Sequence, residues 1–448
     1  MKKLLIIFLT LSVPAGAVEF RVSLKASEDG ALARSGQYRA ARLSAGAARA
    51  AQAAASSLLY PRLSLEGALR YTAVIPEISL PAVMGGAKPL GDNWGYSLGP
   101  TAYWTLDAGA LRYGREAAGR LAAARTEEEE AARRQALLSA RSAYFRLQLA
   151  LEKVYLIAEN LQLSLSQLSD VEAGVKAGTR SRLDGIRARQ EVTERRRDLL
   201  RARAALADVI KEFSFVTGIE PPAGAGLPID SRMAGHDYAG DTFAGLVVGA
   251  ESYLDILPRL LPAAERELGA SQPAVLALEE NGRAFRASAG AYKAEKLPRV
   301  TFTARSSVDY PNGPNLYSFL QNYAGLSLSM PLFEKGRLGE REKESLLNAQ
   351  AAEERRDEAA RAAAREYYSA LDDYSALMEE QSINIDAVDD ASAAAKLAYE
   401  AYKAGSLTWL EVESANLKEL QAKTTAASAN AEILLKLAVL DSLTGSVN

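Results

Sequence analysis

The sequence predicts a mainly α-helical protein with a transmembrane β-barrel, built from a helix–strand–strand–long-helix unit that occurs twice in tandem. Three observations lead to this fold class. The two halves of the chain share short motifs at constant spacing. Each half contains two stretches in which apolar and polar residues alternate, as in a strand with one wet face. Each half then continues into a very long run of apolar residues spaced three and four apart.

The internal repeat relates positions 227 residues apart over most of its length. The matching pairs are Ala177-Gly178 with Ala404-Gly405, Leu183-Asp184 with Leu410-Glu411, Gly109 with Gly336, and Thr217-Gly218 with Thr444-Gly445. Upstream of Gly109 the offset is 237, where Tyr60-Pro61-Arg62-Leu63 matches Leu297-Pro298-Arg299-Val300. A longer loop in the first copy accounts for the difference between the two offsets.

The first copy is expected to span residues 18–218. It opens with an alanine-rich helical stretch near residues 23–58. Strands follow at about 60–71 and 95–107, and long helices occupy about 115–217.

The second copy is expected to span residues 271–448 and to repeat this order. Its helical stretch lies near 271–296, and its strands lie at about 298–310 and 322–332. Long helices at about 338–443 complete it.

Two regions lie outside the copies. At the N-terminus, two lysines precede an apolar run at 4–11 and a small-residue cleavage site, which predicts a signal peptide over residues 1–17. Residues 219–270 form a linker rich in glycine and proline, followed by an equatorial segment whose amphipathic stretch, about 243–268, is expected to lie outside the barrel.

The long helices carry a seam of apolar residues that predicts coiled-coil packing against neighbouring helices. In the second copy only Gln381 interrupts this seam. The first helix would be roughly 90 Å long at about 1.5 Å per residue. A compact domain does not need such a length, whereas a structure that bridges a wide gap does.

The strands cannot form a barrel within one chain, because two strands per copy give only four, and open edges are not stable in lipid. Closure therefore requires several chains. The polar alternate positions are expected to line a wet lumen; they are Arg62, Glu66, Arg70, Arg305 and Asp309. Soluble hairpins packed on a core are the alternative interpretation of the same alternation.

Composition excludes several functional classes. The chain has no cysteine, and its formal net charge of −3 gives no electrostatic case for binding nucleic acid. His236 is the only histidine and lies in the linker, so no histidine-based triad or multi-histidine metal site exists. We therefore expect no enzyme activity, no metal and no cofactor.

Taken in order, these features resemble the TolC-like outer membrane efflux protein family, also called outer membrane factors. The resemblance rests on the duplicated strand–strand–long-helix unit, on the L-P-x-[LIV] entry into the first strand and on the A-G-x-x-x-x-L-[DE] helix break. It implies a homotrimer with a 12-stranded barrel in the outer membrane, continued by an α-helical tunnel that places most of the mass in the periplasm.

The resemblance also implies partners and a role. Members work with a periplasmic adaptor (membrane fusion protein) and an inner-membrane transporter, in tripartite efflux or type I secretion systems, as passive exit ducts. A periplasmic helical adaptor or scaffold protein is the alternative role, because it also combines helical hairpins with β-structure.

The resemblance places a gate near the helix breaks. By resemblance, Asp184 is expected to hydrogen-bond Tyr402, and Glu411 is expected to be a second acid at the constriction. The sequence departs from the family pattern at Leu407 and Ser414, where an arginine and an aspartate would stand, so we expect the closing network to be rewired or weaker. The first copy carries Arg180 at the position equivalent to Leu407.

The helix breaks at Gly178 and Gly405, together with Trp409, are expected to be the tips that contact the adaptor. Each assignment has a simpler alternative. Asp184 and Glu411 equally suit helix capping, since acids favour helix N-termini. Packing is an alternative for Tyr402 and Trp409.

Overall fold

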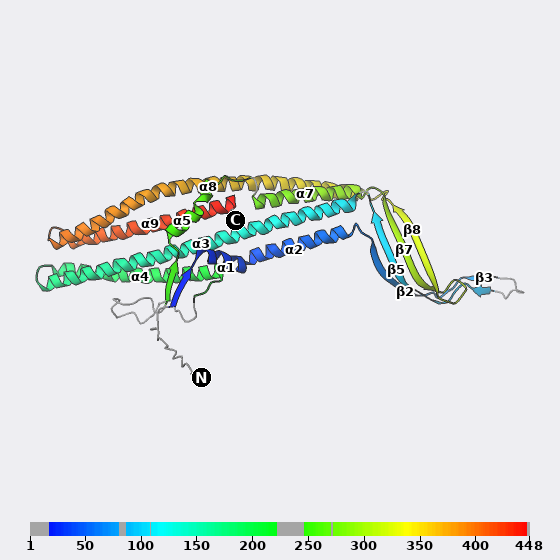
Figure 1. Cartoon of the computed structure of the whole chain (residues 1–448), viewed down its shortest axis with the longest axis horizontal. Coiled ribbons are helices and arrows are strands. Elements are labelled where there is room, and N and C mark those ends of the chain that lie inside the picture. The colour runs from blue at the N-terminus through cyan, green and yellow to red at the C-terminus, as the bar shows by residue number, and fades with distance from the viewer. Residues whose placement is uncertain (1–17, 80–86, 108, 222–245, 270–271, 446–448) are drawn as a thin grey trace, which may run out of the picture. The chain divides into compact units, whose positions relative to one another are not determined.

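The computed structural model describes residues 18–79, 87–107, 109–221, 246–269 and 272–445 (Figure 1). The expected signal peptide, residues 1–17, lies outside the described residues. The chain divides into two compact units. Unit 1 comprises Met1–Arg39, Ala132–Gln272 and Arg361–Asn448; unit 2 comprises Ala40–Ala131 and Pro273–Ala360. Each unit therefore takes segments from both copies of the repeat.

The helix bounds follow the internal repeat residue for residue. The pairs are α2 (Gly36–Ser57) with α7 (Pro273–Ala294), α3 (Ala110–Lys176) with α8 (Arg337–Lys403), and α4 (Arg182–Thr217) with α9 (Trp409–Thr444). The first pair is related by the 237-residue offset and the other two by the 227-residue offset. None of the described helices has the length and apolar character needed to cross a membrane.

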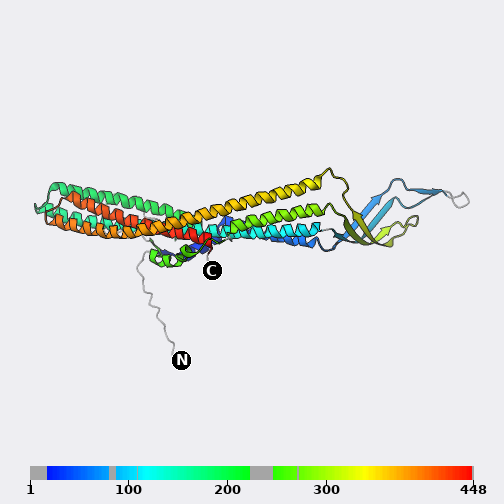
Figure 2. The same cartoon turned by 90° about the horizontal axis from the view of Figure 1, so that it is seen from above.

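Unit 1 contains the C-terminal parts of the long helices α3 and α8, and the hairpins that they form with α4 and α9. Its core is made of large side chains from these helices, fully buried where they meet; the largest include Tyr144, Phe145, Leu147, Leu206, Phe213, Ile433, Leu434, Leu437 and Leu440. In Figures 1 and 2 the α3–α4 turn and the α8–α9 turn lie at the same end of this unit. The apolar seam seen in the sequence is therefore the surface through which the helices pack.

A small sheet and short helices cover part of unit 1. Strand β1 (Val18–Val22) pairs in parallel with β6 (Leu246–Ala250), and helix α1 (Leu24–Arg34) follows β1. Helices α5 (Tyr253–Leu260) and α6 (Pro262–Glu265) follow β6. The amphipathic stretch expected at 243–268 is described from residue 246 onward, and its first described residues form strand β6. Residues of high β-propensity at its start pair with a partner distant in sequence.

Unit 2 contains most of α2, all of α7, and the N-terminal parts of α3 and α8. These helices lie side by side in the order α2–α3–α7–α8, and the two views agree on this order (Figures 1 and 2). An ion pair crosses each junction. The pairs are Arg49–Glu129 at 3.5 Å between α2 and α3, Arg120–Glu280 at 3.3 Å between α3 and α7, and Arg286–Glu353 between α7 and α8. Helices α2 and α8 are therefore the two outer helices of this row of four.

The same unit carries an antiparallel sheet in the order β2–β5–β7–β8. Its strands are β2 (Arg62–Tyr71), β5 (Trp94–Leu106), β7 (Arg299–Tyr310) and β8 (Phe319–Ser329). A short hairpin, β3 (Glu77–Ser79) with β4 (Ala87–Pro89), lies between the first two in sequence. Strand β8 ends three residues before the expected position 332, because Pro331 has no N–H to continue a ladder.

Candidate functional site

The two hairpin ends are built in the same way. Gly178 and Gly405 have φ of +75° and +83°, a left-handed conformation that glycine adopts without strain. Each lies two residues after a long helix and four residues before the next one. The predicted helix breaks are thus tight turns, and they bring the ends of α3, α4, α8 and α9 together.

The two returning helices are capped differently. The Ser181 hydroxyl accepts a hydrogen bond from the Asp184 N–H at 3.1 Å, whereas the Asp184 carboxylate takes no part in the cap. At the second turn the Glu411 carboxylate accepts from the Thr408 N–H at 2.7 Å, within a capping box. This backbone hydrogen bond lowers the pKa of Glu411. The capping interpretation therefore fits Glu411 directly.

A basic side chain from the first hairpin contacts the second. The Arg180 guanidinium lies 4.4 Å from the centre of the Tyr402 ring and donates to the Lys403 carbonyl at 2.7 Å. Tyr402 in turn packs edge-on against Trp409, with ring centroids 5.2 Å apart. A cation over an aromatic face is attractive, so this contact holds the two hairpin ends together.

The expected hydrogen bond between Asp184 and Tyr402 is not formed. The Tyr402 hydroxyl is buried and has no hydrogen-bond partner among the described residues. Burial raises the pKa of this tyrosine, and the negative charge of Asp184 raises it further. The Arg180 guanidinium lies on the face of the ring instead. The family expectation was wrong at this pair, and Arg180 makes the link to the second hairpin.

A second link between the hairpins was not anticipated. The Tyr399 hydroxyl donates to the Asp170 carboxylate at 2.5 Å, and the Lys403 ammonium lies 4.9 Å from the centre of the Tyr399 ring. Burial and this hydrogen bond raise the pKa of Tyr399. Tyr399 stands one helical turn before Tyr402, and that spacing was the available signal for a shared face.

Trp409 is fully buried, in a cluster with Val171, Ala188 and Val412. In this structure its side chain is a packing residue, and contact with a partner would require it to move. Of the two departures from the family pattern, Leu407 is half-buried and Ser414 is exposed. The structure thus brings together Arg180, Tyr402 and Trp409, and places Glu411 in a cap.

The five residues expected to line a lumen all lie on one face of the four-stranded sheet, as strand register and alternation require. Glu66 is the centre of a polar cluster there. It accepts hydrogen bonds from the Tyr103 hydroxyl at 2.9 Å and the Thr101 hydroxyl at 3.3 Å. The Arg62 guanidinium lies 5.6 Å from the Tyr103 ring centre.

The opposite face of the sheet is apolar and exposed. Leu63, Leu65, Leu69, Leu326 and Leu328 are each at least 70% exposed. Monomeric soluble proteins rarely expose so many large apolar side chains on one surface. One wet face and one apolar face is the pattern of a strand that separates water from lipid.

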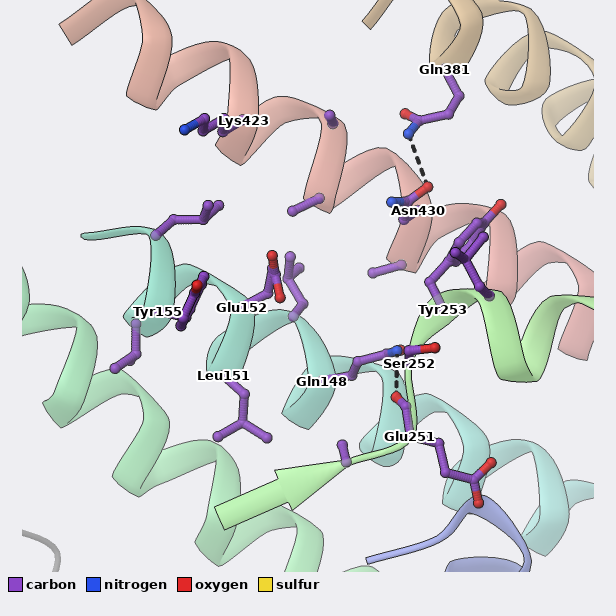
Figure 3. A pocket seen from close by; sticks show the side chains of 18 of the residues that line it. Gln148, Leu151, Glu152, Tyr155, Glu251, Ser252, Tyr253, Gln381, Lys423 and Asn430 are labelled. Atoms are coloured by element: carbon purple, nitrogen blue, oxygen red, sulfur yellow. Dashed lines mark hydrogen bonds between the residues drawn. The ribbon is translucent and has the colours of Figure 1, made fainter. Parts of the chain in front are cut away.

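Unit 1 also contains an open groove of about 1110 Å³ (Figure 3). It is lined by α3, α8, α9 and the start of α5, and its walls include Tyr155, Tyr253, Met378 and Ile385. Gln381, the residue that interrupts the apolar seam, donates to the Asn430 side chain at 2.9 Å beside this groove. The Gln381 amide nitrogen therefore has a polar partner on the neighbouring helix, whereas its side-chain oxygen has none among the described residues.

Across the described residues, no group of His, Cys, Asp or Glu side chains is arranged to hold a metal ion. The polar chemistry of the chain lies at the hairpin ends, on one face of the sheet and within the helical core.

Solved structures with a similar fold include outer-membrane channels and an outer membrane protein. CusC matches with a TM-score of 0.72 and 20% identity, covering 98% of this chain and 96% of that one. VceC of Vibrio cholerae matches with a TM-score of 0.70 and 19% identity, covering 95% and 97%. CmeC of Campylobacter jejuni matches with a TM-score of 0.71 and 15% identity, covering 94% and 85%.

A search of curated proteins gives no significant match. The family model described as outer membrane efflux protein matches residues 29–209 and 266–446. These two stretches contain most of both copies of the repeat, so the family model accounts for the duplication as well as for the fold. The chain belongs to the outer membrane efflux protein family.

Proposed function

We propose that this chain is one subunit of a homotrimeric channel in the outer membrane, and that three copies close a 12-stranded barrel continued by a helical tunnel in the periplasm. The channel gives substrates a passive exit duct. An inner-membrane transporter and a periplasmic adaptor would load it, in a tripartite efflux or type I secretion system.

The observation that carries the proposal is the four-stranded sheet with two open edges. Strands β2 and β8 each lack a neighbour on their outer side among the described strands. Backbone groups at an open edge have no partner in lipid. Pairing β8 of one copy with β2 of the next would satisfy both edges and would place the five lumen residues on the inner face.

The outer helices support the same closure through the internal repeat. Within the chain, α3 meets α7 through the Arg120–Glu280 ion pair. The repeat offsets place Leu347 of α8 at the position of Arg120 and Leu43 of α2 at the position of Glu280. Leu43 is 75% exposed and Leu347 is 55% exposed. A contact between α8 and α2 of the next copy would bury this pair of leucines.

Disulfide cross-linking tests the closure directly, because the chain has no native cysteine. The mature protein is purified in detergent from outer membranes, and its mass is measured. Leu43→Cys and Leu347→Cys are produced separately and also co-expressed, so that mixed assemblies form in the cell, and each purified sample is then oxidised. We expect a particle of three chain masses, and covalent dimers only when both variants are present.

A register control uses Glu340→Cys in place of Leu347→Cys. Position 340 lies two helical turns away, about 10 Å along the axis, so cross-linking should fall sharply. A soluble monomer released with the periplasm would contradict the channel and favour the adaptor or scaffold alternative. A trimer without the cross-link would contradict the leucine contact alone.

The hairpin ends are the proposed periplasmic gate. Three copies would bring Asp184 and Glu411 into rings of carboxylates, which attract cations and repel anions. Arg180 and Tyr402 would hold each pair of hairpins closed. The turns at Gly178 and Gly405 would be the tips that the adaptor contacts.

A further inference from the structure

A layer of buried polar side chains lies inside the helical core of unit 1, away from the hairpin ends. Ser164 and Gln167 come from α3, Glu191 from α4 and Asn416 from α9. All four are at most 2% exposed. Glu191 lies nine residues into α4, roughly 14 Å from the start of that helix. None of these four residues belongs to the proposed gate.

The hydrogen bonds of this layer are incomplete. Asn416 donates to the Gln167 side-chain oxygen at 2.8 Å and to Glu191 Oε1 at 3.4 Å. Ser164 also donates to Glu191 Oε1 at 3.4 Å. Glu191 Oε2 and the Asn416 side-chain oxygen have no hydrogen-bond partner among the described residues. The layer therefore contains two buried acceptors without a donor.

The charges around Glu191 do not compensate a buried carboxylate. Glu413 on α9 is a like charge that raises the pKa of Glu191, whereas the opposite charge of Arg195 on α4 lowers it. The Arg195 guanidinium is already engaged with Asp198 at 2.8 Å. The residues that α3 contributes, Ser164 and Gln167, are neutral. Burial is the main cause that raises the pKa of Glu191.

We propose that Glu191 is a proton-binding site, and that its protonated carboxyl holds α4 against α3 and α9 within this buried layer. A proton on Oε2 supplies a donor where the layer has two orphan acceptors, and it removes a charge from the core. A buried polar network with all members satisfied is rigid, whereas an unpaired buried charge is costly.

Loss of the proton has a defined structural consequence. A carboxylate at this position would be buried beside Glu413 with one oxygen unpaired, and this cost is relieved when α4 separates locally from α9. The direction of the pH dependence follows from the raised pKa of Glu191. The stabilisation is fully present below the unfolded value for glutamate and is lost as pH rises through the folded value. Alkaline conditions should therefore loosen the contact between the hairpins.

The repeat gives this layer no counterpart in the other hairpin. Positions equivalent to Ser164, Gln167 and Glu191 are Ala391, Ala394 and Lys418. Lys418 is exposed. The proton site is thus a feature of the first copy and of its contact with α9, and it does not depend on whether the channel assignment holds.

Infrared difference spectroscopy tests protonation in the full-length mature protein in detergent. The native protein should show the carbonyl stretch of a protonated carboxyl at pH values above the unfolded glutamate pKa, and the band should disappear on raising the pH further. Glu191→Gln should lack the band, whereas Glu194→Gln, an exposed acid on the same helix, should keep it. Absence of such a band in the native protein would overturn the proposal, whether or not the variants fold.

Hydrogen exchange tests the structural consequence. Corrected for intrinsic rates, amides of α4 and α9 near Glu191 should open more often in the native protein as pH rises, by up to about tenfold per pH unit. Glu191→Gln keeps the shape and donates a proton at every pH, so this dependence should be lost. An unchanged pH dependence in Glu191→Gln would assign it to another group and overturn the proposal.

Discussion

The hairpin formed by α3 and α4 and the hairpin formed by α8 and α9 have matching lengths but different buried chemistry. The buried face of α4 includes the charged residues Glu191 and Arg195. The buried face of α9 is mostly apolar and includes Trp409 and Ile433. The duplication thus fixes the backbone, and later divergence has given each hairpin a different interior.

The same asymmetry governs the hairpin ends. Arg180 of the first copy corresponds to Leu407 of the second, and Tyr402 of the second copy corresponds to Val175 of the first. The cation and the aromatic ring of the central contact therefore come from different copies. The contact that links the two ends therefore uses residues that the copies do not share.

The largest expected effect on the free energy of unfolding comes from truncating Trp409. Truncation of a buried tryptophan to alanine costs about 3–5 kcal/mol of unfolding free energy, and Trp409→Ala also removes the ring that supports Tyr402. The equivalent residue of the first copy, Arg182, is exposed, so Arg182→Ala should change stability by about 0.5 kcal/mol or less. Thermal unfolding of the two variants measures the difference. Equal losses would contradict the asymmetry.

The second largest effect on stability is expected from breaking the nearly buried ion network around Arg141. Arg141 donates to Glu28 at 2.5 Å and to Asp441 at 2.6 Å, and Arg266 contacts Asp441 at 2.8 Å. Arg141→Met removes the one ion pair that Glu28 makes among the described residues and should cost about 3 kcal/mol.

The matched control is Tyr368→Met, at the equivalent position of α8, where the side chain is 61% exposed. This change should be close to neutral in denaturant unfolding. If Arg141→Met is also neutral, the network does not tie α1 and α9 to α3.

The sequence was most informative where structure is local and periodic. The apolar seams predicted α3 and α8, and Gly178 and Gly405 marked the breaks, because helix period and glycine conformation are short-range properties. The pairing of β1 with β6 was not predicted, because each strand has five residues and its partner is more than two hundred residues away.

The candidate site was predictable only in part, for a related reason. The resemblance located the hairpin ends and named Tyr402 and Arg180, but contacts between the hairpins depend on which side chain fills each position. An arginine in the first copy displaced the expected partner of Tyr402. The bond from Tyr399 to Asp170 has no counterpart in the repeat, since the equivalent positions are Glu172 and Leu397.

Removal of Arg180 should weaken the contact at the proposed gate more than it weakens the fold. Arg180→Ala removes the interaction with the Tyr402 ring and the hydrogen bond to Lys403, each worth about 1 kcal/mol. We expect an open population roughly 30-fold larger, since about 1.4 kcal/mol corresponds to a factor of ten; it is measured as open probability in single-channel recordings in planar bilayers. Leu407→Ala, at the equivalent position of the second copy, should leave conductance near the native level.

A double-variant cycle separates the ring contact from general loosening. If Arg180→Ala and Tyr402→Leu together open the channel no more than either alone, the two residues act as one contact. Additive effects would mean that they act independently.

The smallest effect concerns the two caps. Glu411 has a lowered pKa because it accepts from the Thr408 N–H, so its contribution is present above the unfolded glutamate value and is lost as pH falls through the folded value. Glu411→Ala should speed hydrogen exchange in the first turn of α9 near neutral pH, and this difference from the native protein should shrink in acid. Asp184→Ala is the matched change in α4, where Ser181 supplies the cap. It should leave the first turn of α4 protected at both pH values, because the capping oxygen is untouched. Equal loss of protection in both helices would mean that the acids act through the helix dipole alone, and that the two ends are alike in this respect.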